Sequence, residues 1–125
     1  MSRIRGFDTG IEKAVRAGIN KLGLRYRKNV MSLPGRPDLV FMSARVAVFV
    51  DGDFWHGYRY PSWKNRLPTF WRAKIERNRA RDRRNFAALQ RRGWRVVRIW
   101  EHEVEGDLTE CVRRVVSALR GERRR

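Results

Sequence analysis

The chain has 125 residues, of which 42% are hydrophobic and 34% are charged. We expect a single folded domain over residues 1–125, because the length suits one core rather than two and the apolar content is too high for a wholly disordered chain. Lysine and arginine number 30 against 13 acidic residues, which gives a net charge of +17, so nucleic acid is the first candidate partner.

The single cysteine, Cys111, excludes an internal disulfide and is typical of a reducing compartment. The sequence shows no signal peptide and no apolar run of membrane length. A membrane surface is a weaker candidate partner, because no amphipathic helix combines lysines with exposed aromatic residues. We therefore expect a cytoplasmic, nucleoid-associated protein without membrane contact.

The N-terminal segment predicts a basic arm over residues 1–7 and a helix over residues 8–22. The arm is either a frayed terminus, which is favoured, or a segment that grasps DNA. Thr9 and Glu12 match a capping box at the start of the helix, whose apolar residues recur on one face. Glu12 therefore has two interpretations, as that cap or as a ligand of a metal or water reaching toward Asp38.

Residues 24–30 alternate well enough to predict a first strand. The rigid turn at 34–37 separates it from 38–42 and 46–51, two nearly continuous apolar runs that predict a hairpin buried on both faces. Asp38 opens the first strand of this hairpin. A Pro-Asp pair is common in turns, but an aspartate that opens a buried strand in a very basic chain favours a functional role.

Acidic side chains and a histidine gather at one end of this hairpin. Asp38 begins one strand, Asp51 and Asp53 follow the other, and His56 comes directly afterwards. Converging carboxylates suit one divalent cation, because a hard cation prefers oxygen ligands. A histidine beside that cation can move a proton near neutral pH. The pattern predicts a metal-dependent nuclease.

Residues 52–69 predict a polar loop with a high density of aromatic side chains. Basic residues lie among the rings, a combination that suits stacking on bases or wedging between them. The alternative is a small satellite core under the loop, and the same rings can serve both purposes. The aromatic residues are Phe54, Trp55, Tyr58, Tyr60 and Trp63.

Residues 70–92 predict a long basic helix whose outer arginines track phosphates. A spacing of three and four places Asp82 among apolar neighbours on its inward face. A buried carboxylate is costly unless it is paired, so we expect Asp82 to pair with His56 in an arrangement that recurs in catalysis. The alternative is a pair with Arg79 or Arg83 on a solvated edge.

The C-terminal part predicts a strand over 94–100 and a helix over 107–120, followed by a basic tail over 121–125. The strand follows a helix, so a parallel crossover onto the sheet is expected. Residues 101–103 are expected to cap the end of the strand. Cys111 lies on the apolar face of the last helix and is expected in the core.

The predicted order is helix, three-stranded antiparallel meander, long helix, parallel strand and C-terminal helix. This is the order of the α/β core of restriction-endonuclease-like nucleases. Six blocks within residues 3–103 also resemble, in order, the very-short-patch-repair endonuclease family, and a collinear series is more specific than any single motif. The blocks are 36–41, 49–56, 70–78, 81–84, 93–96 and 100–101.

The resemblance implies a magnesium-dependent endonuclease that nicks double-stranded DNA beside a T:G mismatch. It implies that Asp38 holds Mg²⁺ and that Val50 lends its backbone carbonyl, at a position where the family usually has threonine. Asp51 is a further candidate ligand. A monomer is expected, with repair proteins as candidate partners.

The resemblance also implies roles around the metal and along the DNA. His56 would act as acid or base with Asp82 as its partner, and Glu12 would sit at the outer shell of the metal. Phe54, Trp55 and Trp71 would form a wedge that enters the DNA stack. The basic residues expected on the DNA are Arg36, Arg72, Lys74, Arg77 and Arg81.

This chain departs from the family where members often carry a structural zinc held by cysteines and histidines. The corresponding positions are Asp53, Tyr58, Tyr60 and His102, and a zinc site without thiolates here is not expected. Asp53 and His102 are instead candidates for a charged pair across the same gap.

Two other functions use the same features. A defence or restriction-type nuclease would cut both strands with the same core residues, and a dimer would favour that function. A non-catalytic basic DNA-binding module would follow from a decayed site. The presence of Asp38, His56 and Asp82 together argues against decay.

Overall fold

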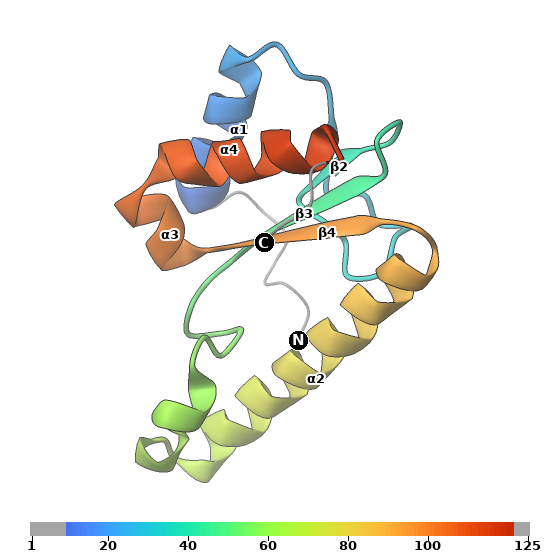
Figure 1. The fold of residues 1–125 in the computed structure, drawn as a ribbon. Coiled ribbons are helices and arrows are strands. Elements are labelled where there is room, and N and C mark those ends of the chain that lie inside the picture. The colour runs from blue at the N-terminus through green and yellow to red at the C-terminus, as the bar shows by residue number, and fades with distance from the viewer. Residues whose placement is uncertain (1–9, 122–125) are drawn as a thin grey trace.

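A four-stranded sheet forms the centre of the protein, whose computed structural model describes residues 10–121 (Figure 1). Its strands lie in chain order as β1 (Arg27–Lys28), β2 (Leu39–Phe41), β3 (Val46–Asp51) and β4 (Arg95–Trp100). The first three are antiparallel neighbours, and β4 joins β3 in parallel. The predicted α/β core of the restriction-endonuclease-like fold is confirmed.

Helices cover both faces of this sheet (Figure 1). On one face lie α1 (Gly10–Lys21), the short α3 (Glu101–Gly106) and α4 (Leu108–Leu119). The other face carries α2 (Thr69–Arg91), which supplies the crossover between β3 and β4. The predicted crossover and the long basic helix are therefore both present, and the helix begins one residue before the expected position.

The strands are apolar on both sides because each side faces a helical layer. Along β3, Val48 and Val50 belong to the larger core under α1 and α4, whereas Phe49 packs with residues of α2. Successive side chains of a strand point to opposite faces, so Asp51 shares the α2 side with Phe49. This alternation turns the last side chain of β3 toward α2.

The larger core is tight where α1 crosses α4. A Cβ atom on Gly18 would lie 2.6 Å from Cγ2 of Val112, so only glycine permits this approach of the two helices without movement. Cys111 lies in the same core, as predicted, and burial raises the pKa of its thiol. This layer is mainly apolar, and apart from Glu12 on α1 the candidate acidic and histidine residues lie on the α2 side and at the strand ends.

Two elements differ from the sequence prediction. The first strand was expected over residues 24–30, but only Arg27 and Lys28 pair with β2. Asn29, with a positive φ of 49°, leaves the extended conformation directly after them. Residues 101–103 do more than cap a strand, since they begin α3. The Glu103 carboxylate accepts a hydrogen bond from the Trp100 N–H at 2.9 Å, which stabilises the start of that helix.

The predicted arm over residues 1–7 lies outside the described residues, as does Thr9 of the proposed capping box. Of the predicted tail, only Gly121 is described. None of the helices within residues 10–121 combines the length and the apolar character needed to cross a membrane.

The connection from β3 to α2 contains two short 3₁₀ helices, η2 (Tyr60–Ser62) and η3 (Lys64–Arg66). It runs beyond the end of the sheet and returns at the start of α2 (Figure 1). This loop therefore carries its residues past the end of β3, where the candidate site lies.

Candidate active site

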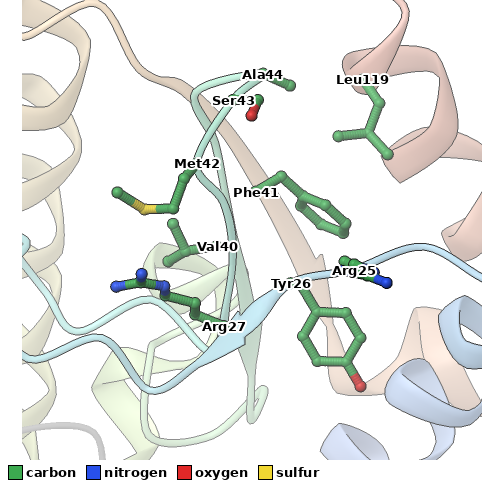
Figure 2. A pocket seen from close by; sticks show the side chains of 9 residues that line it. All are labelled: Arg25, Tyr26, Arg27, Val40, Phe41, Met42, Ser43, Ala44 and Leu119. Carbon is green, nitrogen blue, oxygen red and sulfur yellow. The ribbon is translucent and has the colours of Figure 1, made fainter.

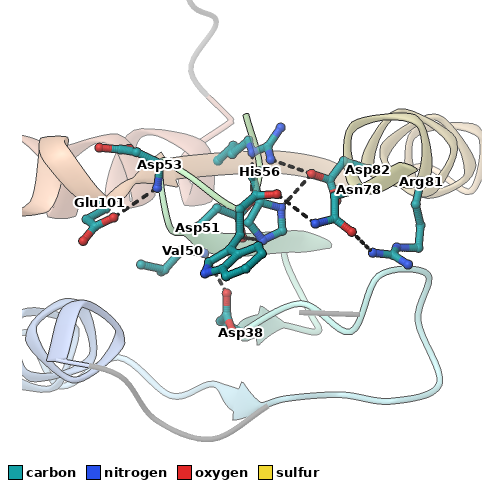
Figure 3. Close-up of polar contacts among 11 residues, drawn as sticks. Asp38, Val50, Asp51, Asp53, His56, Asn78, Arg81, Asp82 and Glu101 are labelled. Atoms are coloured by element: carbon teal, nitrogen blue, oxygen red, sulfur yellow. Dashed lines mark hydrogen bonds and ion pairs between the residues drawn. The ribbon is translucent and has the colours of Figure 1, made fainter. Parts of the chain in front are cut away.

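Three titratable side chains meet between the end of β3 and the middle of α2 (Figure 3). Asp51 is the last residue of β3, His56 lies in the following loop, and Asp82 lies on α2. All three are buried, and one ligand atom from each lies within 4.8 Å of the others. Asp82 is therefore not on a solvated edge, and the alternative pairing with Arg79 or Arg83 on such an edge does not apply.

The imidazole of His56 lies between the two carboxylates. Its Nδ1 is 2.8 Å from Oδ2 of Asp82, whereas its Nε2 is 3.6 Å from Oδ1 of Asp51. An ionised carboxylate only accepts hydrogen bonds, so the short contact places the ring proton on Nδ1 in the neutral imidazole. The distance to Asp51 exceeds a hydrogen bond, and Nε2 is then the nitrogen that remains for a reacting group.

A partly buried arginine joins the same two carboxylates. Nε of Arg98 donates to Oδ2 of Asp51 at 2.8 Å, and its Nη2 donates to Oδ2 of Asp82 at 2.7 Å. The guanidinium carbon lies 4.1 Å from the centroid of the Trp100 ring. Arg98 was not predicted from the sequence, although a charged residue inside the apolar strand predicted over 94–100 needs a partner and could have been identified for that reason.

Asp38 lies next to β3 at the start of β2. Its Oδ2 accepts a hydrogen bond from the backbone N–H of Val50 at 2.6 Å, and its own N–H donates to the Val48 carbonyl at 2.9 Å. Its carboxylate is buried, and it lies outside the group formed by Asp51, His56 and Asp82. The site thus has two parts, the Asp38 carboxylate beside Val50 and the His56 cluster beyond it (Figure 3).

The donors in the two parts suit a cation differently. Asp38 offers carboxylate oxygen, the ligand that magnesium prefers. In the His56 cluster, a cation would have to compete with Arg98 for both carboxylates, and one of the three donors is an imidazole nitrogen, which suits zinc or a transition metal better. The residues therefore fit a hard divalent cation at Asp38. Glu12 is buried in the first turn of α1.

The loop that carries His56 is attached directly to α2. Asn78 donates from Nδ2 to the carbonyl of Trp55 at 2.9 Å. Gly57 has a φ of +70°, and a Cβ atom there would lie 2.6 Å from Cδ of Arg79 and 2.9 Å from Cγ2 of Ile75. The residues on both sides of His56 are therefore held against the helix that supplies Asp82. Asn78 lies on the predicted inward stripe of that helix.

An aromatic cluster lies beside this loop, formed by Phe54, Trp55, Trp63, Phe70 and Trp71. The rings of Phe54 and Trp63 stack with centroids 5.7 Å apart, and the centroids of Trp55 and Trp71 are 5.6 Å apart. The exposed fractions are 40% for Phe54, 64% for Phe70 and 36% for Trp71. The cluster contains the three rings predicted as a wedge. It also contains Trp63, which was predicted among the stacking rings of the loop, and Phe70, for which no such role was predicted.

The predicted DNA-binding basic residues lie on the turn before β2 and along α2. Arg36 and Arg77 are exposed, whereas Arg72, Lys74 and Arg81 are partly buried. Nζ of Lys74 lies 5.8 Å from the centroid of the Phe70 ring, so one of these cations borders the aromatic cluster. Arg72, Arg77 and Arg81 lie on the same helix as Lys74, whereas Arg36 lies on the turn before β2.

The positions expected to replace a zinc site form a network of their own. Nδ1 of His102 lies 3.0 Å from Oδ1 of Asp53, so the candidate pair is present. The ring of Tyr58 lies 4.3 Å from that of His102 by centroids. The hydroxyl of Tyr60 donates to Glu76 at 2.7 Å, and burial, together with this hydrogen bond, raises the pKa of Tyr60. A phenol held in its neutral form is a poor metal ligand.

A separate cavity lies at the turn end of the β2–β3 hairpin (Figure 2). It has a volume of about 390 Å³, and its walls include Arg25, Arg27, Phe41 and Leu119. Asp38 and Asp51 stand at the opposite end of the same hairpin. The cavity is therefore distinct from the catalytic candidates, and its lining supplies neither a carboxylate nor a histidine.

The sheet order, a buried carboxylate beside β3 and a histidine paired with a second carboxylate define a nuclease of the restriction-endonuclease-like class. A family model described as DNA mismatch endonuclease Vsr matches residues 1–62. The chain is 46% identical over 109 residues to the type II nicking enzyme V.XorIIP of Xanthomonas oryzae pv. oryzae, a match that covers 83% of this chain and 78% of the relative.

Two further relatives point the same way. The chain is 44% identical to the type II nicking enzyme V.NmeDIP of Neisseria meningitidis serogroup C, over 87% of this chain and 76% of the relative. It is 40% identical to DNA mismatch endonuclease Vsr of Escherichia coli K12, over 85% of this chain and 69% of the relative. The chain belongs to the DNA mismatch endonuclease Vsr family, and it is a DNA endonuclease.

Proposed function

We propose that this endonuclease nicks one strand of double-stranded DNA beside a mismatch of the T:G type, with magnesium as its cofactor. The observation that carries the proposal is an exposed aromatic cluster next to a buried histidine–carboxylate pair. The names of the relatives support both halves of it, since one is a mismatch endonuclease and others are nicking enzymes.

The aromatic cluster supplies a physical basis for mismatch selection. Unstacking a base step costs a few kcal/mol, and the cost is lowest where the bases are already mispaired. Phe54 and Trp55 directly precede His56 in the chain. A ring inserted into a weakened step would therefore bring the neighbouring backbone toward Nε2 of His56.

Asp38 and the backbone carbonyl of Val50 would hold Mg²⁺, with Asp51 as a further candidate ligand and Glu12 at the outer shell. When bound, magnesium stabilises the negative charge that develops on the scissile phosphate and favours formation of the attacking hydroxide. Asp38 is suited to this role because its buried carboxylate is already oriented by the Val50 N–H.

His56 and Asp82 form the proton-transfer pair of the proposal. Asp82 fixes the ring orientation through Nδ1 and stabilises the imidazolium when it forms. Nε2 is left to take a proton from the attacking water or to give one to the leaving oxygen, and both directions fit this geometry. The pair affects rate, whereas the aromatic cluster affects the choice of substrate.

Basic side chains along α2 and on the preceding turn would position the duplex. Arg36, Arg72, Lys74, Arg77 and Arg81 would contact phosphates without reading sequence. We further propose that the enzyme acts as a monomer in the cytoplasm, associated with the nucleoid, and that repair proteins are its partners. The loop would keep its structure without zinc, through the contacts of Asp53 and Tyr60.

The proposal is tested with end-labelled duplexes that are matched or carry a T:G pair, and with single-stranded DNA, each with and without Mg²⁺. We expect a nick in one strand of the T:G duplex only when magnesium is present. Double-strand cleavage of matched DNA would support a restriction-type nuclease instead. Binding without cleavage under all conditions would indicate a non-catalytic DNA-binding module.

A further inference from the structure

We propose that Arg98 is a positioning residue of this endonuclease, which holds Asp51 and Asp82 in place on either side of His56. The inference rests on the proposed function, since it assigns His56 to proton transfer. Arg98 binds both carboxylates that flank the His56 imidazole. It can therefore hold the two carboxylates in a fixed arrangement around the ring.

The guanidinium of Arg98 makes two different hydrogen bonds within one plane. Nε binds Asp51 and Nη2 binds Asp82, at 2.8 and 2.7 Å. Arginine has a rigid planar fork of donors, whereas lysine has a single ammonium. The two carboxylates are therefore placed to accept from two nitrogens of one guanidinium. A lysine ammonium carries the same charge but cannot make both hydrogen bonds in this geometry.

The plane of the guanidinium is itself restrained. Its carbon lies 4.1 Å from the ring centroid of Trp100 and 5.0 Å from that of Phe86. The arginine side chain is 22% exposed, so aromatic rings replace much of its hydration. Contacts of this kind attract a cation and also limit its rotation. Arg98 is therefore a fixed support rather than a mobile surface charge.

Arg98 also keeps Asp51 away from the reactive nitrogen. With Oδ2 held by Arg98, the other oxygen of Asp51 stays 3.6 Å from Nε2 of His56. Without the guanidinium, the buried Asp51 carboxylate would lose this cation, and a hydrogen bond from Nε2–H of the nearby His56 would offset part of that loss. The imidazole would then change tautomer, and Nε2 would no longer be open to the substrate.

Arg98 also fixes the orientation of the Asp82 carboxylate. Its Oδ2 accepts from both His56 and Arg98, so the arginine fixes the direction from which the carboxylate meets Nδ1. Loss of Arg98 should loosen this orientation even when Asp51 carries no charge. Two separate effects of Arg98, on Asp51 and on Asp82, therefore predict a specific pattern in combined variants.

The experiment uses the full chain and single-turnover cleavage of a T:G duplex, with DNA affinity measured in parallel. The variants are Arg98→Met, Arg98→Lys, Asp51→Asn and the combination of Asp51→Asn with Arg98→Met. Arg95→Met is the matched control, because Arg95 is an exposed arginine of the same strand. Urea unfolding of each variant separates lost structure from lost positioning.

We expect Arg98→Met and Arg98→Lys to lower the cleavage rate by about 10- to 100-fold, the usual range for a residue that supports an active-site group. DNA affinity should change by less than about twofold, as in Arg95→Met, because Arg98 bonds to the carboxylates and not to DNA. In the Asp51→Asn background, Arg98→Met should lower the rate by about a further tenfold, because the Asp82 contact is still lost.

A spectroscopic measurement tests the positioning role without reference to cleavage. The chain has two histidines, so the nitrogen-15 signals of His56 are assigned by comparison with a His102→Gln variant. At a pH where the nitrogen-15 signals show the ring to be neutral, the wild type should show the Nδ1–H tautomer alone. Arg98→Met should add or favour the Nε2–H tautomer, while Arg95→Met should not.

The results separate three outcomes. An unchanged tautomer and an unchanged rate in Arg98→Met would overturn the inference. If Arg98→Met has no further effect in the Asp51→Asn background, Arg98 merely neutralises Asp51 and the positioning of Asp82 is wrong. If the wild type cleaves no DNA but its tautomer shifts in Arg98→Met, the proposed function fails while the positioning role of Arg98 stands.

Discussion

Asp82 illustrates how one buried charge links the fold to the chemistry. It lies on the inward stripe of α2, where desolvation would be costly without partners, and its Oδ2 accepts from His56 and Arg98. The Asp82–His56 contact was predictable, because an acidic residue on an apolar helix stripe needs a partner and His56 was the available one. Arg98 was missed because β4 was read only for its apolar residues.

We predict that Asp82→Asn slows the chemical step while the preference among substrates stays the same. Asparagine keeps the shape of the side chain but loses the charge that stabilises the imidazolium. The single-turnover rate should fall by about 10²- to 10⁴-fold, the range for loss of proton-transfer catalysis. Glu110→Gln, which alters an exposed carboxylate on α4, is the control. A changed ratio between mismatched and matched cleavage would assign Asp82 to recognition instead.

We predict that Asp38→Asn abolishes magnesium-dependent cleavage and leaves DNA binding intact. The Asp38 side chain offers carboxylate oxygen, the ligand that a hard cation prefers, and its Oδ2 already accepts a hydrogen bond from the backbone N–H of Val50. The measurement pairs a magnesium titration of the cleavage rate with a DNA-binding isotherm for each protein. Cleavage at the wild-type rate would remove Asp38 from the metal site.

At the scale of elements, periodicity predicted the hairpin, the long helix and the parallel strand, whose apolar patterns are strong. It did not predict the shortness of β1, because the positive φ of Asn29 depends on how the chain turns toward β2. It also missed α3, which is only six residues long and is stabilised by the contact of Glu103 with the Trp100 N–H. Short elements depend on local contacts that have no periodic signal.

The aromatic cluster at the start of α2 should control mismatch preference. Truncation of Trp55 or Trp71 to alanine removes a ring that could enter a weakened base step, so the ratio of T:G to matched cleavage should fall by about tenfold. Leu22→Ala removes an exposed apolar side chain beyond α1 and serves as the control. If both tryptophan variants keep the wild-type ratio and only lose stability, the rings belong to a core rather than to a wedge.

The loop between β3 and α2 should keep its structure without bound zinc. The Asp53–His102 pair and the hydrogen bond from Tyr60 to Glu76 connect it to α3 and α2, and no cysteine lies in the loop. We predict an unchanged thermal midpoint after treatment with a chelator. Elemental analysis that found about one zinc per chain would contradict this prediction and would require a site built on histidine and carboxylate ligands.

At the scale of the whole molecule, the two layers of helices divide the work. The face with α1 and α4 buries an apolar core, whereas the face with α2 buries the His56 cluster and carries the basic helix. The helix order and the parallel crossover made this division predictable from the sequence. The exact meeting of β3, β4 and α2 was not predictable, because it depends on a register in which Phe49 lies opposite Arg98.

The net charge of +17 predicts binding to DNA of any sequence with a steep dependence on salt. Neutralising six to ten phosphates lowers affinity by about 10³- to 10⁵-fold between 50 and 200 mM salt, because condensed counterions are released on binding. The charge should act mainly through α2, so Arg77→Gln should reduce the slope of log affinity against log salt by about one.

Arg113 is an exposed arginine on α4, on the opposite face of the sheet, and it is paired with Glu110. Arg113→Gln should therefore leave the slope unchanged. Equal slopes for the wild type and both variants would show that Arg77 on α2 does not contact a phosphate. Binding of DNA to the α2 face would then depend on the aromatic cluster.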